Sequence, residues 1–192
     1  MNKYIFLDID GVLWTIGWSV YAERGGKRGE RMSYRQWDPI ASSNLQWVLD
    51  KVPRAKVVIS STWRMGRSLK ELRSIAKRSG IDPRRIVGAT PVMRTDKKSW
   101  RFFWWGWGTP HGRKNWWRPF SIRYCVSNVP RGREIQRWMD KRRVKAKNIA
   151  ILDDDTDMAH LRKRLVKTCS MDGLGFKKAL ELLDMLGGAR KR

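Results

Sequence analysis

The chain has 192 residues, with 42 Lys and Arg against 18 Asp and Glu, a formal net charge of +24 and 12 Trp. This length is typical of one domain with a sizeable core, and 41% hydrophobic residues exclude a disordered basic tail. No apolar stretch reaches the roughly 18 residues of a membrane span, and the charge favours a polyanion such as nucleic acid as partner.

Short apolar segments with the composition of buried strands recur along the chain. They are Tyr4–Ile9, Lys56–Ser60, Arg85–Gly88, Asn148–Leu152 and Leu165–Cys169. Each is rich in Ile, Val or Leu, which is typical of parallel strands covered on both faces. The predicted helices are Ser42–Asp50, Ser68–Ser79, Arg133–Arg143 and Phe176–Leu186. The alternation predicts an α/β fold with a doubly wound parallel sheet, as one domain over residues 1–192.

Two of the predicted helices carry further signals. Ser68 and Glu71 have the spacing of a capping box, and Gly80 is placed to end the same helix. The helix Arg133–Arg143 has apolar side chains at helical spacing on one face and a basic surface opposite.

Two segments interrupt the alternation. Trp14–Trp37 is rich in Gly and Arg and is predicted to form a flap over the end of the first strand. Residues 93–130 contain half of the Trp residues, and eight Lys or Arg against one acid. Connections this long are usually functional or disordered, and the aromatic content argues against disorder. We predict a basic, Trp-rich cap inserted into the domain.

The cysteine content and the N-terminal sequence give weak indications of the cellular compartment. Cys125 and Cys169 are too few for a disulfide framework or a thiolate metal site, so we expect them to be small packing residues. The N-terminal apolar run is broken by Asp8 and Asp10 and has no cleavage-site pattern, so no signal peptide is expected. These features predict a cytoplasmic protein.

The first predicted strand runs into two carboxylates, Asp8 and Asp10, and then Gly11, which lets the chain turn away. Open α/β sheets bind their ligands at the carboxyl ends of the strands. Carboxylates this close favour a divalent cation, and ligands that are all oxygens point to Mg²⁺. Taken alone, the pair is equally compatible with solvated aspartates at a strand end.

A second acidic cluster follows the fourth predicted strand, with Asp153, Asp154 and Asp155 in succession and Asp157 beyond. Consecutive carboxylates repel one another unless a cation balances them. We predict that Asp153 and Asp154 bind the metal. Asp155 and Asp157 are also compatible with stabilising a helix N-terminus.

The second predicted strand ends in hydroxyl side chains, Ser60, Ser61 and Thr62. Hydroxyls and backbone N–H groups at such a position can hold phosphoryl oxygens. The same residues are common helix caps, so this signal is weak by itself.

The order of these motifs resembles the haloacid dehalogenase-like phosphohydrolases. FLDIDGVL, VVISSTWR, RGREI and ILDDDTDM resemble in particular the small branch of that superfamily found in RNA-repair proteins, in segments that span the core. The resemblance implies that Asp8 is a nucleophile that forms an aspartyl-phosphate and that Asp10 is the acid and base. It also implies a Mg²⁺ ion held by Asp8, the Asp10 backbone carbonyl, and Asp153 or Asp154.

The resemblance further implies that Ser60, or else Ser61, hydrogen-bonds the phosphoryl group. The family's third motif usually supplies a Lys, whereas this chain offers Arg131 as the best match and Arg133 as the second. An Arg can still grip a phosphate in a bidentate manner. We expect Arg64 and Arg133 to contact the substrate as well, and Asp10 implies a phosphatase or phosphotransferase rather than a dehalogenase.

The Trp-rich insert lies between the second and third motifs, where superfamily members often carry a cap that selects the substrate. Aromatic and basic side chains interleave in it, which suits single-stranded nucleic acid. The candidate contacts are Trp104, Trp105, Trp107, Arg113, Lys114, Trp116 and Trp117. The same composition is compatible with packing onto the core or with a membrane interface.

The sequence therefore predicts a Mg²⁺-dependent phosphatase that acts on nucleic-acid ends or nucleotides through an aspartyl-phosphate, with no obligate protein partner. The alternative is a nucleic-acid-binding protein that uses the same fold as a scaffold, with little or no catalysis.

Overall fold

A single parallel sheet organises the computed structural model, which describes residues 1–24, 36–93 and 129–187. Its strand order is β3-β2-β1-β4-β5. The bounds are β1 (Lys3–Leu7), β2 (Ala55–Ile59), β3 (Ile86–Ala89), β4 (Ile149–Asp153) and β5 (Leu165–Lys167). Strand β1 is central, because Ile5 lies beside Val57 of β2 on one side and Ala150 of β4 on the other. The predicted α/β fold with a parallel sheet is confirmed.

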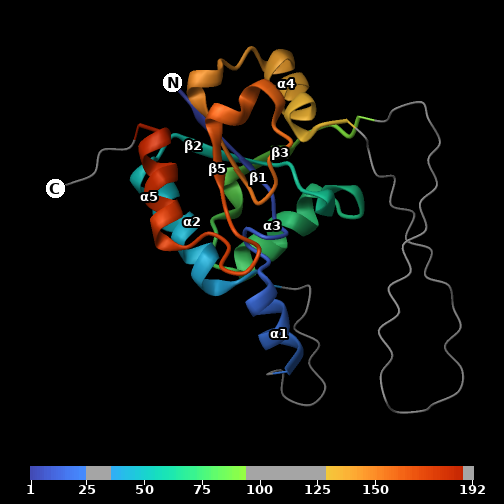
Figure 1. Cartoon of the computed structure of the whole chain (residues 1–192), viewed down its shortest axis with the longest axis vertical. Coiled ribbons are helices and arrows are strands. Elements are labelled where there is room, and N and C mark those ends of the chain that lie inside the picture. Colours follow the sequence, from blue (N-terminus) through green and yellow to red (C-terminus); the bar gives the residue numbers. More distant parts are fainter. Residues whose placement is uncertain (25–35, 94–128, 188–192) are drawn as a thin grey trace, which may run out of the picture.

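Helices connect the strands and cover the sheet, as Figure 1 shows. The α-helices are α1 (Ile16–Arg24), α2 (Pro39–Lys51), α3 (Leu69–Arg78), α4 (Arg131–Arg142) and α5 (Phe176–Met185). Short 3₁₀ helices are η1 (Thr62–Met65), η2 (Pro83–Arg85), η3 (Ala146–Asn148) and η4 (Ala159–Arg164).

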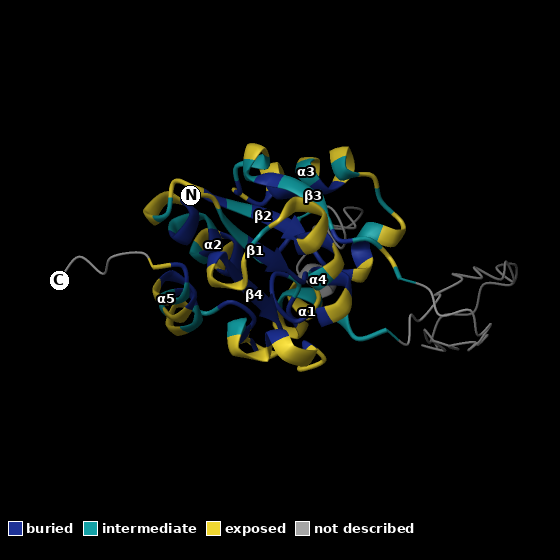
Figure 2. Cartoon of the chain, turned by 90° about the horizontal axis from the view of Figure 1, so that it is seen from above, coloured by how far each residue is buried: buried dark blue, intermediate teal, exposed yellow. Residues whose placement is uncertain are grey.

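The two faces of the sheet bury two separate apolar clusters. Alternate residues point to opposite faces, so Ile5 and Leu7 of β1 pack with α2, α3 and α5, whereas Phe6 packs with α4 and η4. The strands β1, β2 and β4 are mostly buried, the edge strands β3 and β5 less so, and the outward faces of the helices are exposed (Figure 2). This burial on both faces explains why the strands are almost continuously apolar in sequence.

The predicted elements match the observed ones closely. Each predicted strand begins and ends within two residues of the observed strand. The capping box of α3 is confirmed, because Ser68 Oγ accepts from Glu71 N and the Glu71 carboxylate accepts from Ser68 N. Helix α2 begins earlier than expected, because Asp38 caps it and Pro39 occupies its first turn.

Three sequence-based expectations need correction or lie beyond the described residues. Trp14–Trp37 contains the helix α1, which was not predicted because Gly17 lowers helix propensity, although Thr15 Oγ1 caps it by accepting from Trp18 N at 3.0 Å. Cys169 is exposed rather than a packing residue, because it follows β5 in a turn. Of the predicted Trp-rich cap, residues 94–128 lie outside the described residues.

The helices that the structure describes are all too short or too polar to cross a membrane.

Candidate active site

Three carboxylates converge at the carboxyl ends of the two central strands. Asp8 directly follows β1, and Asp153 is the last residue of the neighbouring strand β4. One carboxylate oxygen from each of Asp8, Asp153 and Asp154 lies within 4.8 Å of the other two. Asp8 is only 4% exposed and Asp153 is fully buried, so the cluster is largely withdrawn from water.

Gly11 allows Asp154 to join this cluster. Its φ of +69° is in the left-handed region, and a Cβ at this position would lie 2.1 Å from Asp154 Oδ2. Thr168 Oγ1 holds the turn by donating to the Gly11 carbonyl at 2.9 Å. The glycine is therefore required both for the turn and for the approach of the carboxylate.

Arg131 supplies the cation that faces this cluster. Its Nη1 lies 2.9 Å from Asp8 Oδ1 and 3.1 Å from Asp153 Oδ2, and it donates to the Ser60 carbonyl at 3.1 Å. Burial lowers the pKa of Arg131, but the charges of Asp8 and Asp153 outweigh it and raise that pKa above its usual value. Arg133, the second candidate from sequence, is exposed on α4.

The start of α4 fixes the position of Arg131. Asp157 caps this helix from another segment, because its Oδ2 accepts from Arg131 N at 3.0 Å and its carbonyl accepts from Gly132 N at 3.2 Å. A Cβ on Gly132 would lie 2.1 Å from the Met158 carbonyl, so only glycine allows this contact. Asp157 thus stabilises a helix N-terminus, although the helix is not the one that follows it in sequence.

The carboxylate cluster carries an unbalanced negative charge. Burial and the charge of Asp8 raise the pKa of Asp153, although Arg131 lowers it. Burial and Asp8 likewise raise the pKa of Asp154. One guanidinium therefore does not neutralise the site, and further positive charge would stabilise it.

Asp10 lies at the rim of the cluster and is held by the loop after β2. Trp63 Nε1 donates to Asp10 Oδ1 at 2.9 Å, and Thr62 Oγ1 donates to Oδ2 at 3.4 Å. Loss of surrounding water raises the pKa of Asp10, the charges of Asp8 and Asp154 raise it further, and the two hydrogen bonds lower it. The net upward shift favours a carboxyl that can both donate and accept a proton.

The two serines after β2 have different surroundings. Ser60 is fully buried, and its Oγ has no hydrogen-bond partner within the described residues. Ser61 Oγ caps η1 by accepting from Trp63 N at 3.3 Å. Because buried hydroxyls are almost always hydrogen-bonded, Ser60 Oγ is the atom better placed to bind a ligand oxygen.

Arg64 is engaged with protein groups. Its guanidinium donates to the carbonyls of Ser60 at 2.8 Å, Ser61 at 2.6 Å and Thr90 at 3.1 Å, and it pairs with the Glu134 carboxylate. The Arg64 and Glu134 side chains are 7% and 6% exposed. Arg64 therefore connects α4 to the loop that carries Ser60, Ser61 and Thr62, which we call the hydroxyl loop.

Glu134 has a second contact. Its Oε1 accepts from Met93 N at 2.9 Å, at the end of the described segment that follows β3. One buried carboxylate on α4 therefore connects the hydroxyl loop with the chain leading into the predicted cap.

The family model described as "HAD domain in Swiss Army Knife RNA repair proteins" matches residues 4–179, where HAD denotes the haloacid dehalogenase-like fold. The chain belongs to this family. The match covers all five strands apart from Lys3 at the start of β1, and it covers the whole carboxylate cluster. No curated protein and no solved structure matches the chain.

The residues of this HAD domain fit a bound metal ion, and HAD-like phosphohydrolases typically use one. Asp8 Oδ1 and Asp153 Oδ2 are buried, and both share the single Nη1 of Arg131 as an ion-pair partner. With Asp154 they form a set of three carboxylate ligands, the donor type that Mg²⁺ prefers. The three carboxylates therefore supply a suitable metal site.

Two residues that shape the HAD domain's site, Trp63 and Glu134, have no role in the sequence prediction. Trp63 holds Asp10, and Glu134 holds Arg64. Trp63 lies in the motif SSTWR and Glu134 in the motif RGREI, so the motifs could have drawn attention to both residues. The motifs do not indicate that Trp63 contacts Asp10 or that Glu134 contacts Arg64. The predicted contacts Trp104, Trp105, Trp107, Arg113, Lys114, Trp116 and Trp117 lie outside the described residues.

Proposed function

We propose that this HAD domain is a Mg²⁺-dependent phosphatase that removes a terminal phosphate from nucleic-acid ends or nucleotides. The observation that carries the proposal is the convergence of Asp8, Asp153 and Asp154 at the strand ends around Arg131, whose guanidinium also donates to the Ser60 carbonyl. Asp8, Asp153, Asp154 and the Asp10 backbone carbonyl would hold the ion. When bound, Mg²⁺ supplies positive charge that offsets the charge of the phosphoryl oxygens.

In the first step, a carboxylate oxygen of Asp8 attacks phosphorus and the bond between phosphorus and the ester oxygen breaks. Asp10 donates its proton to that leaving oxygen. The raised pKa of Asp10 suits this role, because a larger share of the carboxyl remains protonated near neutral pH. The products are the free alcohol and an aspartyl-phosphate on Asp8.

In the second step, Asp10, now a carboxylate, accepts a proton from water as the water oxygen attacks phosphorus. The bond between phosphorus and the Asp8 oxygen breaks, which releases inorganic phosphate and restores both side chains. The Trp63 and Thr62 hydrogen bonds keep Asp10 in place for both proton transfers.

The remaining residues would bind the phosphoryl group and the rest of the substrate. Ser60 Oγ and Arg131 would donate to phosphoryl oxygens, and Ser61 and Arg64 would act mainly by fixing the loop that presents Ser60. Arg133 is exposed and would meet a more distant part of the substrate. The Trp-rich cap would stack on bases.

Two considerations favour a nucleic-acid substrate. The net charge of +24 attracts polyanions, and the matching family is described from RNA repair proteins. A polynucleotide would engage the basic surfaces at several phosphates, whereas a mononucleotide would engage only the site. The expected cytoplasmic location stays a prediction.

The test is phosphate release from an aryl phosphate and from end-phosphorylated oligonucleotides, with Mg²⁺ or with a chelator. We expect Asp8→Asn to lose turnover by on the order of 10³-fold or more, because the nucleophile is removed. Asp155→Asn is the matched control, because Asp155 is exposed and lies outside the carboxylate cluster. Equal turnover in wild type and Asp8→Asn would reject the nucleophile. Oligonucleotide binding without turnover of any ester would favour the scaffold alternative.

A further inference from the structure

Helix α4 carries cations that lead away from the candidate active site. The helix begins at Arg131, which contacts Asp8, and continues with the exposed residues Arg133, Arg137 and Lys141. Residues four positions apart lie on the same face of a helix, so these three form a stripe about 12 Å long.

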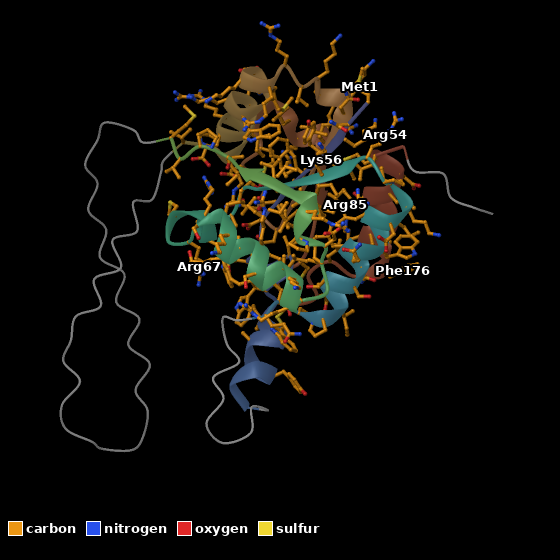
Figure 3. The ribbon with its side chains drawn as sticks, turned by 180° about the vertical axis from the view of Figure 1, so that it is seen from behind. Met1, Arg54, Lys56, Arg67, Arg85 and Phe176 are labelled. Carbon is orange, nitrogen blue, oxygen red and sulfur yellow. The ribbon has the colours of Figure 1, made fainter. Side chains whose placement is uncertain are left out.

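The stripe continues past the helix into the segment that leads to β4. We define the α4 basic face as Arg133, Arg137, Lys141, Arg143, Lys145 and Lys147, all of which are exposed. Helix η4 lies beside α4, where His160 Nε2 is 2.8 Å from Gln136 Oε1, and it adds the exposed Arg162 and Lys163. Nitrogen-tipped side chains project outward around this end of the molecule (Figure 3).

The cations of the α4 basic face have no carboxylate partners. Within the part of the chain that the structure describes, none of the six forms an ion pair. The exposed acid on this helix, Asp140, accepts a hydrogen bond from Gln136 instead. Like charges four residues apart destabilise a helix, so the fold gains nothing from this arrangement. An anionic partner would remove the repulsion.

The surroundings favour a nucleic-acid strand over an anionic membrane. Membrane-surface helices combine their cations with exposed apolar side chains. Among the described residues, the large exposed apolar side chains include Ile16, Val20 and Tyr21 of α1, and none lies on α4, η3 or η4, although Met1 lies beside the far end of the face. A face of this kind matches a backbone of repeated phosphates, which proteins contact without reading sequence.

We infer that the α4 basic face binds the sugar-phosphate backbone of a nucleic-acid strand whose terminal phosphate enters the candidate active site. The inference rests on the proposed function, because the site determines which end of the strand is held. Such a face favours a polynucleotide over a mononucleotide as the substrate class, because a mononucleotide bound in the site would not reach beyond the start of α4.

The face also has a definite length. From Arg131 to Arg143 the chain rises about 18 Å, which corresponds to about five nucleotides of a stacked strand at 3.4 Å each. At the far end, Arg143 and Lys145 line a shallow cavity of about 240 Å³ together with Tyr4 and Met1, and Figure 3 labels Met1 at this end of the molecule. Because Lys145 and Lys147 extend the face beyond Arg143, affinity should rise with strand length over at least about five nucleotides.

The test compares two variants that each lose three positive charges. The first is Arg137→Gln, Lys141→Gln and Lys145→Gln, which leaves Arg131 and Arg133 intact. The control is Lys70→Gln, Lys77→Gln and Lys177→Gln, on the exposed faces of α3 and α5. Binding of a labelled single-stranded oligonucleotide of about ten nucleotides, without a terminal phosphate, is followed by fluorescence anisotropy across salt concentrations.

For the α4 variant we expect the oligonucleotide affinity to fall on the order of tenfold. The slope of log K against log salt concentration should also decrease in magnitude by about 2. Turnover of an aryl phosphate should stay at the wild-type level, and the control variant should bind like wild type. Equal weakening in both variants, or no weakening in either, would overturn the inference. Binding of anionic phosphatidylserine vesicles that depends on the same three residues, with unchanged oligonucleotide binding, would overturn it in favour of a membrane.

The two proposals fail in different measurements. Absence of aryl-phosphate turnover in the wild-type protein would reject the proposed function, whereas anisotropy on an oligonucleotide without a phosphate end tests the face without any catalysis.

Discussion

The two sides of the sheet differ in packing and in charge. Helices α2, α3 and α5 cover one side over the larger apolar cluster, and they contain seven Lys or Arg against four acids. The other side is covered by α4 and η4 over a smaller cluster. There, residues 131–148 and 159–164 contain eleven Lys or Arg against two acids. One side therefore mainly stabilises the fold, and the other concentrates charge.

The α4 side is also the one that completes the candidate site. Arg131 faces the carboxylate cluster, Glu134 holds Arg64, and Asp157 caps the helix on which both side chains lie. The comparison shows that a helix can cover a sheet and position site residues at the same time. Changes to the buried residues at the start of α4, such as Glu134, should therefore affect stability and catalysis together, whereas changes on α5 should affect stability alone.

The largest effect is expected for Glu134→Gln. This change leaves the Arg64 charge buried without its carboxylate, which typically costs about 3–5 kcal/mol of unfolding free energy. The kcat/KM for an aryl phosphate should fall as well, because Arg64 positions the carbonyls of Ser60 and Ser61. Denaturant unfolding and steady-state kinetics measure the two effects. Asp140→Asn, on the exposed face of the same helix, is the control, and an equal response of both variants would contradict the assigned role.

A smaller effect, confined to stability, is expected for Leu182→Ala on α5. Leu182 is fully buried in the larger cluster, so its truncation should lower the unfolding free energy by about 3 kcal/mol. The half-buried Leu180, changed to Ala, should cost less. The kcat of the folded fraction should stay at the wild-type value. A lower kcat in Leu182→Ala would contradict the claim that the α5 side of the sheet contributes to stability alone.

Measured over a single pH unit, the smallest effect is the pH dependence of the unfolding free energy, which arises at the site between the two sides. The folded protein raises the pKa of Asp153 from 3.8 to about 8, so its ionisation opposes folding. Its contribution to stability is therefore greatest at acid pH and is lost as the pH rises towards 8, by at most about 1.4 kcal/mol per pH unit. In a chelator, Asp153→Asn should flatten this part of the stability curve and stabilise the protein at neutral pH.

Thermal unfolding with and without Mg²⁺ completes this last test. Mg²⁺ should stabilise the wild type more at pH 8 than at pH 5, because protons compete for its carboxylate ligands. The Asp153→Asn variant should gain less. A Mg²⁺ response that is the same in both proteins would show that Asp153 does not contribute to metal binding.

Much of the fold follows from local sequence patterns. The apolar runs of β1, β2 and β4, the capping box of Ser68 and Glu71, and the apolar face of α5 depend on residues close in sequence, and the structure has all of them. Helix α1 was missed because Gly17 weakens the local helical signal.

The sequence by itself determined the fold class and the identity of the strand-end carboxylates. Asp8 and Asp153 follow from the rule that parallel strands present their carboxyl ends at one edge of the sheet. Only the tertiary structure decided that Arg131 rather than Arg133 faces Asp8, that Trp63 holds Asp10, and that the α4 basic face leads away from the site without an ion pair to any described residue. These contacts join residues far apart in the chain. Helix docking against the sheet determines them, and local periodicity carries no information about that docking.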